Sequence, residues 1–96
     1  NVGVRPNPFK KSALHDNASQ PFDHKLLFYN LPPQCKITIL DVAGQIIDEI
    51  NFSDATKGSY FWDMFSKDGI EVASGLYIYL VESSAGKKVG YFSILR

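Results

Sequence analysis

Apolar and polar residues alternate in the middle of the chain with the period of a β-strand. Cys35, Ile37 and Ile39 are separated by polar residues, so their side chains share one face of an extended segment. A second apolar segment follows the Val-Ala-Gly break at residues 42–44. The pattern predicts a β-hairpin over residues 36–52.

The C-terminal part of the chain has a different pattern. Residues 76–81 are apolar at every position, as in a strand that is covered on both sides or whose outer face meets a partner. A last predicted strand, residues 87–95, is joined to it through the turn at residues 84–86. In an isolated sandwich one face of this hairpin would be polar. Two explanations remain open: an exposed binding surface, or a face covered by residues 11–23 or by a preceding domain.

Turn residues divide the chain into short segments, roughly one every 8–12 residues. The only segment with a helical period, residues 63–66, is too short for a stable helix. We therefore predict an all-β fold, a single immunoglobulin-like antiparallel β-sandwich of about seven strands, as one module over residues 1–96. Residues 11–23 are polar and lack a clear period, so we expect a long connection there.

Length and charge narrow the possible functions. The 96 residues suffice for one core, and ten basic residues balance ten acidic ones. Binding to nucleic acid through phosphate contacts usually requires a basic surplus, so we expect no nucleic-acid partner. No apolar stretch reaches the roughly 18 residues of a membrane span, so we expect no membrane insertion. Cys35 is the only cysteine, which excludes an intramolecular disulfide and suits a buried, inert thiol.

Residues with catalytic or metal-binding chemistry are few. His15 and His24 lack metal-ligand spacing, and the chain has no glycine-rich phosphate loop and no evident nucleophile–base pair. Asp63, Asp68 and Glu71 are the one candidate set for calcium, because oxygen ligands at alternate positions can hold this ion. Their spacing does not match the EF-hand loop of about 12 residues, and turn formation explains them better. We expect no enzymatic activity, no metal and no cofactor.

Five groups of short motifs follow one another along the chain: V-G-V-R-P-N-P-F at residues 2–9, F-Y-N-L-P at 28–32, I-T-I-L-D-V-A-G at 37–44, W-D at 62–63 with D-G at 68–69 and A-S-G-L-Y at 73–77, and K-K-V-G-Y-F-S-I-L-R at 87–96. In this order they resemble the motifs of C-terminal modules in secreted Bacteroidetes-type proteins. The chain departs from these motifs at Leu40, where they frequently have tyrosine. The chain thus resembles the type A sorting domain of the type IX secretion system, a family that overlaps in sequence with the immunoglobulin-like domain of the flagellar hook-capping protein.

The resemblance implies a β-sandwich that serves as an export address, bound by secretion-system proteins as the cargo passes from the periplasm to the outer-membrane surface or the medium. The chain begins with Asn1 rather than Met, and we expect it to be the C-terminal domain of a larger secreted protein, next to an upstream domain. One alternative is a structural module that self-associates into a homo-oligomer. Another is a carbohydrate-binding module, whose candidate platform residues are Tyr29, Tyr60, Phe61 and Tyr91.

Recognition of a partner would use the surface of the terminal hairpin. Basic residues in this set can equally block unwanted strand pairing at a sheet edge. The predicted partner-binding residues are Leu76, Ile78, Leu80, Lys87, Lys88, Tyr91, Leu95 and Arg96. A second set is expected to shape turns and core through restricted backbone, positive φ or a bonded hydroxyl: Pro6, Asn7, Pro8, Asp41, Gly44, Trp62, Asp63, Gly69, Gly75 and Tyr77.

Overall fold

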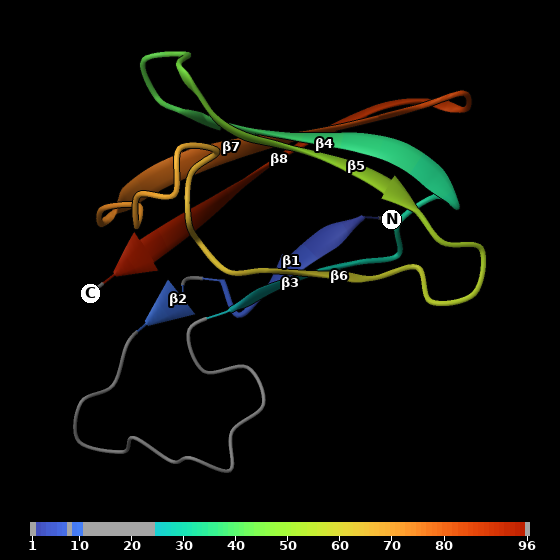
Figure 1. Cartoon of the computed structure of the whole chain (residues 1–96), viewed down its shortest axis with the longest axis horizontal. Helices are drawn as coiled ribbons and strands as arrows, with labels where there is room; N and C mark the ends of the chain where they lie inside the picture. Colours follow the sequence, from blue (N-terminus) through green and yellow to red (C-terminus); the bar gives the residue numbers. More distant parts are fainter. Residues whose placement is uncertain (1, 8, 11–24, 96) are drawn as a thin grey trace, which may run out of the picture.

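The computed structural model describes residues 2–7, 9–10 and 25–95. In these ranges eight strands form two facing sheets (Figure 1), which confirms the predicted all-β sandwich. No helix in the described part could span a membrane. Pro8, Arg96 and the predicted connection at residues 11–23 lie outside the described residues. The strands are β1 (Gly3–Arg5), β2 (Phe9–Lys10), β3 (Leu26–Tyr29), β4 (Gln34–Asp41), β5 (Ile46–Ser53), β6 (Tyr60–Trp62), β7 (Gly75–Ser83) and β8 (Gly86–Leu95).

The two sheets differ in size. The smaller has the strand order β1-β3-β6, and the larger has the order β2-β8-β7-β4-β5. The described pairings are antiparallel, as predicted, except that β2 runs parallel to β8. The N-terminal segment therefore leaves one sheet after β1 and joins the other at β2.

The predicted hairpin is formed by β4 and β5, which pair from Gln34 to Ser53. Asp41 holds the turn, because its Oδ1 accepts the backbone N–H groups of residue 43 at 3.0 Å and residue 45 at 2.9 Å. Gly44 follows with a φ of +85°, a left-handed conformation that is strained for residues with a Cβ. At the start of β7, Gly75 has the predicted positive φ, +158°, which residues with a Cβ rarely adopt.

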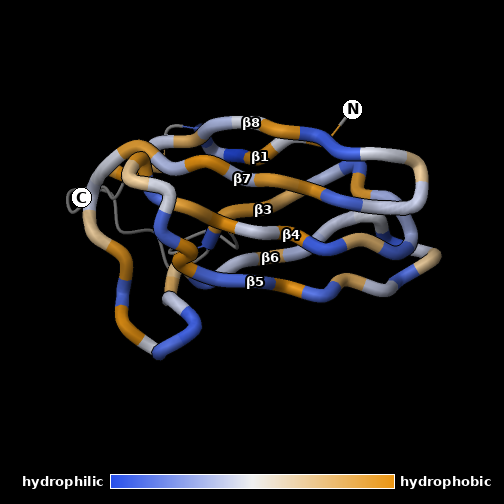
Figure 2. Tube along the Cα trace, turned by 90° about the horizontal axis from the view of Figure 1, so that it is seen from above, coloured by the Kyte–Doolittle hydropathy of each residue, from blue (hydrophilic) through white to orange (hydrophobic). Residues whose placement is uncertain are grey.

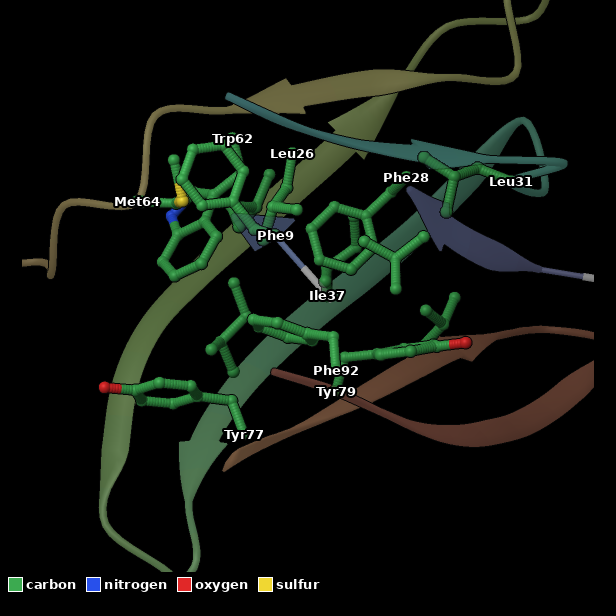
Figure 3. Packing of buried hydrophobic residues seen from close by; sticks show 14 of the residues in the cluster. Phe9, Leu26, Phe28, Leu31, Ile37, Trp62, Met64, Tyr77, Tyr79 and Phe92 are labelled. Atoms are coloured by element: carbon green, nitrogen blue, oxygen red, sulfur yellow. The ribbon is translucent and has the colours of Figure 1, made fainter. Parts of the chain in front are cut away.

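Alternation along the strands directs large side chains between the two sheets. Phe92 of β8 lies near the centre (Figure 3), where its ring stacks on Tyr77 with centroids 5.6 Å apart. Trp62 and Phe28 meet the same ring edge-on at 5.9 and 6.2 Å. Each such ring pair stabilises the fold by about 0.5–1.5 kcal/mol beyond the contribution of the apolar area that it buries. The largest fully buried side chains are Trp62, Phe28, Phe92, Leu26, Ile37, Ile39, Met64, Ile94 and Val81.

Cys35 lies in this core near the start of β4, as the alternation predicted. Burial raises the pKa of its thiol. Because the thiolate is the reactive form, a raised pKa keeps the side chain inert at neutral pH.

Candidate functional site

The larger sheet turns one face to the core and the other to solvent. On the solvent side, Leu40 of β4 lies opposite Ile46 of β5 and Ile78 of β7, and Ile78 lies opposite Tyr91 of β8. Directly opposite residues on one face of a sheet are close neighbours. These four side chains therefore form an apolar row that crosses four strands.

The β7–β8 hairpin carries most of the apolar side chains on this outer face. Tyr91 is 60% exposed, Val89 56% and Leu76 47%. The hydrophobic colouring can be followed along both strands in Figure 2. Val89 was missing from the predicted set, although it shares the face of Tyr91 two residues away. We call the following side chains the outer patch: Leu76, Ile78, Leu80, Val89, Tyr91 and Leu95.

Charged residues replace apolar ones toward the β7–β8 turn. Glu82 lies between Lys36 and Lys87 in the sheet. The Lys87 ammonium is 3.7 Å from the carboxylate of Glu82, and the Lys36 ammonium is 3.2 Å from that of Glu49. Exposed pairs of this kind stabilise by only about 0–1 kcal/mol, but they mark the end of the outer patch. Lys88 lies opposite a core residue of β7, at the edge of the sheet.

The edge of β8 is partly closed by the N-terminal segment. The Asn7 Nδ2 donates to the carbonyl of Tyr91 at 3.0 Å, and the N–H of Ser93 donates to Asn7 Oδ1 at 3.2 Å. One side-chain amide thus makes the two bonds that a neighbouring strand would make. Strand β2 continues the pairing beyond it. Pro6 is exposed and lies between β1 and Asn7.

Trp62 has one polar atom, and Asp48 of β5 satisfies it. The indole Nε1 donates to Asp48 Oδ2 at 3.0 Å, and the Glu49 N–H donates to Oδ1 at 2.8 Å. Asp48 lies opposite Ile39, which faces the core, and the register of β4 and β5 shifts immediately after this pair. Asp48 was missing from the predicted residues, because the register shift breaks the simple alternation that would have placed its side chain on the core face.

Two tyrosines of β7 have buried rings and bonded hydroxyl groups. The Tyr77 hydroxyl donates to the carbonyl of Ala73 at 2.6 Å, and that of Tyr79 donates to the carbonyl of Val2 at 3.4 Å. The Tyr79 ring covers Gly90 so closely that a Cβ atom there would overlap it. Tyr79 and Gly90 are direct neighbours on β7 and β8. Nothing in the sequence indicates that this ring covers this glycine.

The acidic cluster around Gly69 forms a turn. Asp63 Oδ1 accepts the N–H of residue 65 at 3.0 Å, and Ser66 Oγ accepts that of Asp68 at 3.2 Å. Gly69 itself has a φ of +78°. Among the described residues, no three His, Cys, Asp or Glu side chains lie close enough together to hold a metal ion. Asp63, Asp68 and Glu71 are therefore not brought together as a calcium site.

The aromatic residues considered as a sugar platform lie on different surfaces. Tyr91 is on the outer face of the larger sheet, whereas Tyr29 and Phe61 are on the outer face of the smaller one. The Arg5 guanidinium carbon lies 5.0 Å from the centroid of the Tyr29 ring. Tyr60 packs against the core. A planar row of exposed rings is therefore not formed by these residues.

An open groove of about 500 Å³ runs beside β5 and β6. Asp48, Tyr60, Phe65 and Lys67 are among its lining residues. Burial raises the pKa of the Tyr60 hydroxyl, and the negative charges of Asp48 and Asp63 raise it further. No buried side-chain polar atom in the described part of the chain lacks a hydrogen-bond partner.

No family model and no curated protein matches the chain. PorZ from Porphyromonas gingivalis, described as an essential bacterial surface component of the type-IX secretion system, has a TM-score of 0.74 and 22% identity over 100% of this chain. Dimeric latent PorU from the same organism has a TM-score of 0.62 and 18% identity over 98%. FlgD from P. aeruginosa has a TM-score of 0.51 and 19% identity over 97%.

The chain spans 12% of PorZ, 9% of PorU and 70% of FlgD. At these identities the likeness shows a shared fold. The related immunoglobulin-like fold expected from the motifs is therefore supported, and no match identifies a specific sorting domain.

Proposed function

We propose that the chain is a non-catalytic sorting and anchoring module, which directs a secreted bacterial protein through the outer membrane by binding the secretion machinery. The outer patch carries this proposal, because an isolated sandwich would have polar side chains there. Two further observations support it: the order of the sequence motifs, and the fold likeness to PorZ, a surface component of a type-IX secretion system. The parent protein would then reach the cell surface or the medium.

Tyr91 is the best anchor for a partner within the patch. It is 60% exposed and lies at the end of the apolar row, beside partly buried Ile78. Tyrosine is enriched among residues that dominate binding energy, since its ring buries a large area and its hydroxyl can remain hydrated. Truncating such an anchor typically costs about 1–2 kcal/mol or more.

The experiment fuses residues 1–96 to the C-terminus of an inert reporter in a bacterium that has a type IX system. A strain without a working translocon is the control. We expect reporter at the cell surface or in the medium of the competent strain only. Reporter held in the periplasm of both strains would contradict the proposal.

A patch variant tests which surface acts. Leu76→Ser with Tyr91→Ser removes two exposed apolar side chains of the outer patch. Phe61→Ser is the matched control, because Phe61 is exposed but lies on the outer face of the smaller sheet. The patch variant should bind its partner roughly 10- to 100-fold more weakly and lose export, whereas the control should be exported normally. Normal export of a folded patch variant would show that recognition uses another surface.

A structural, self-associating module is the second candidate, since the outer patch could instead bury against a second copy. The similar fold in PorU, described as dimeric, favours this alternative. Sedimentation of the isolated chain separates the two. A dimer that the patch variant abolishes would support self-association, and a monomer at all concentrations would exclude it.

A further inference from the structure

Strand β8 is an edge strand over half of its length. The backbone groups of Tyr91 and Ser93 face away from β7, because the N-terminal segment bonds them there. The backbone N–H and C=O groups of successive residues point to opposite sides of a strand. Those of Lys87 and Val89 therefore also face away from β7, like those of Tyr91 and Ser93. Within the described residues, no strand pairs with β8 on this side between residues 86 and 90.

The open half of the edge lies beside a small hollow with basic residues. The Lys87 ammonium forms an ion pair with the carboxylate of Glu82. Lys88 forms no ion pair within the described part of the chain. The hollow has a volume of about 160 Å³, and none of its lining residues is acidic. These residues are Val2, Pro32, Val81, Ser83, Ala85, Gly86, Lys87 and Lys88.

We propose that the edge of β8 over residues 86–90 is a strand-addition site for an extended, acidic segment of a partner protein. Backbone bonds to Lys87 and Val89 would supply affinity, and carboxylates opposite the two lysines would supply specificity. The same edge already accepts strand-type bonds within the chain, from the Asn7 amide and from β2. An added strand would continue that pairing and would lie beside the exposed side chain of Val89.

Edge protection is the competing explanation for the lysines, since lysine at a sheet edge prevents pairing between copies. The two explanations predict different results for the double variant Lys87→Ser with Lys88→Ser. Loss of an acidic partner's affinity supports strand addition. Unchanged affinity together with new self-association supports protection alone. The inference depends on the sheet edge and not on the export role, so either can fail without the other.

The test is an NMR titration of the isotopically labelled 96-residue chain with a synthetic peptide of about eight residues, mostly valine, with two adjacent glutamates at its centre. The glutamates are adjacent because Lys87 and Lys88 face opposite sides of the sheet. Val89→Pro removes the N–H that faces the open edge and leaves the bonds to β7, since proline is tolerated at such edge positions. Val89→Ala is the matched control, because it removes the side chain and keeps the N–H. The thermal midpoint of each variant verifies that it is folded.

We expect the peptide to slow hydrogen exchange at the Lys87 and Val89 amides. Binding should persist in Val89→Ala and fall by roughly 10-fold or more in Val89→Pro, the equivalent of about 1.4 kcal/mol. No protection at about 1 mM peptide would overturn the proposal, as would equal binding by Val89→Pro. Equal binding of a peptide with lysine in place of glutamate would overturn its acidic specificity. Protection that rises with protein concentration alone would assign the edge to a second copy.

Discussion

Replacement of Asp48 by alanine should destabilise the fold substantially. The Trp62 side chain is 1% exposed, and its Nε1 donates to Asp48 Oδ2 at 3.0 Å. Without the carboxylate this buried donor has lost its acceptor, which costs about 1–3 kcal/mol. The Glu49 N–H loses its 2.8 Å bond as well, at a smaller cost because residue 49 is exposed. Together these losses predict a decrease of about 2–4 kcal/mol in the free energy of unfolding.

Urea unfolding, followed by the fluorescence of the single tryptophan and by circular dichroism, measures this change. Asp48→Asn keeps one oxygen acceptor, so its free energy of unfolding should lie between those of the unchanged chain and of Asp48→Ala. Asp68→Ala is the control, since Asp68 is exposed and contributes to its turn through the backbone N–H. It should stay within about 0.5 kcal/mol of the unchanged chain. The reasoning is refuted if Asp48→Ala also stays within that range, or if Asp68→Ala loses as much.

The remaining predictions concern β8, its contacts and alkaline pH. Asn7→Ala removes both bonds to β8 and should cost about 1–2 kcal/mol in urea unfolding; unchanged exchange at the Ser93 amide would contradict it. Gly90→Val forces a side chain into the Tyr79 ring and should lower the thermal midpoint by about 4 °C or more; an unchanged midpoint would mean that the ring can move freely. Burial raises the pKa of Cys35 and of Tyr79 above their usual 9.0 and 10.0. The unfolded chain ionises first, so the free energy of unfolding should decline from about pH 9 upward; a flat profile to about pH 11 would exclude this linkage.

The faces of the strands could be predicted from the sequence alone. A period of two assigns Cys35, Ile37 and Ile39 to one side of β4 whichever strand lies next to it. For residues 76–81 the same logic predicted an apolar outer face but not its exposure, because a covered and an uncovered face have the same pattern. In the described part of the chain, Leu76 is half exposed while Tyr77 beside it is buried, so none of the described strands covers the outer face at Leu76.

Contacts between distant segments could not be predicted. Asn7 and Ser93 are 86 residues apart, and their bond requires that the chain switch sheets between β1 and β2. The bond between Trp62 and Asp48 requires the register shift beside Asp48. Neither strand order nor register follows from local propensity, because both are set by long-range packing.

The outer patch and the open edge meet at β8 but depend on different atoms. Recognition by the patch requires side chains, so Tyr91→Ser should weaken it while the backbone stays intact. Recognition by the edge requires an N–H group, so Val89→Pro should weaken it roughly 10-fold or more while Val89→Ala should not. A partner that engages both surfaces would be weakened by either change, and the free-energy losses would add only if the two contacts form independently. Leu76 pairs with Ser93, four positions along β8 from Val89, so the two side chains do not touch. Coupling between Leu76→Ser and Val89→Pro in a double-mutant cycle of binding would therefore show that one partner segment spans patch and edge.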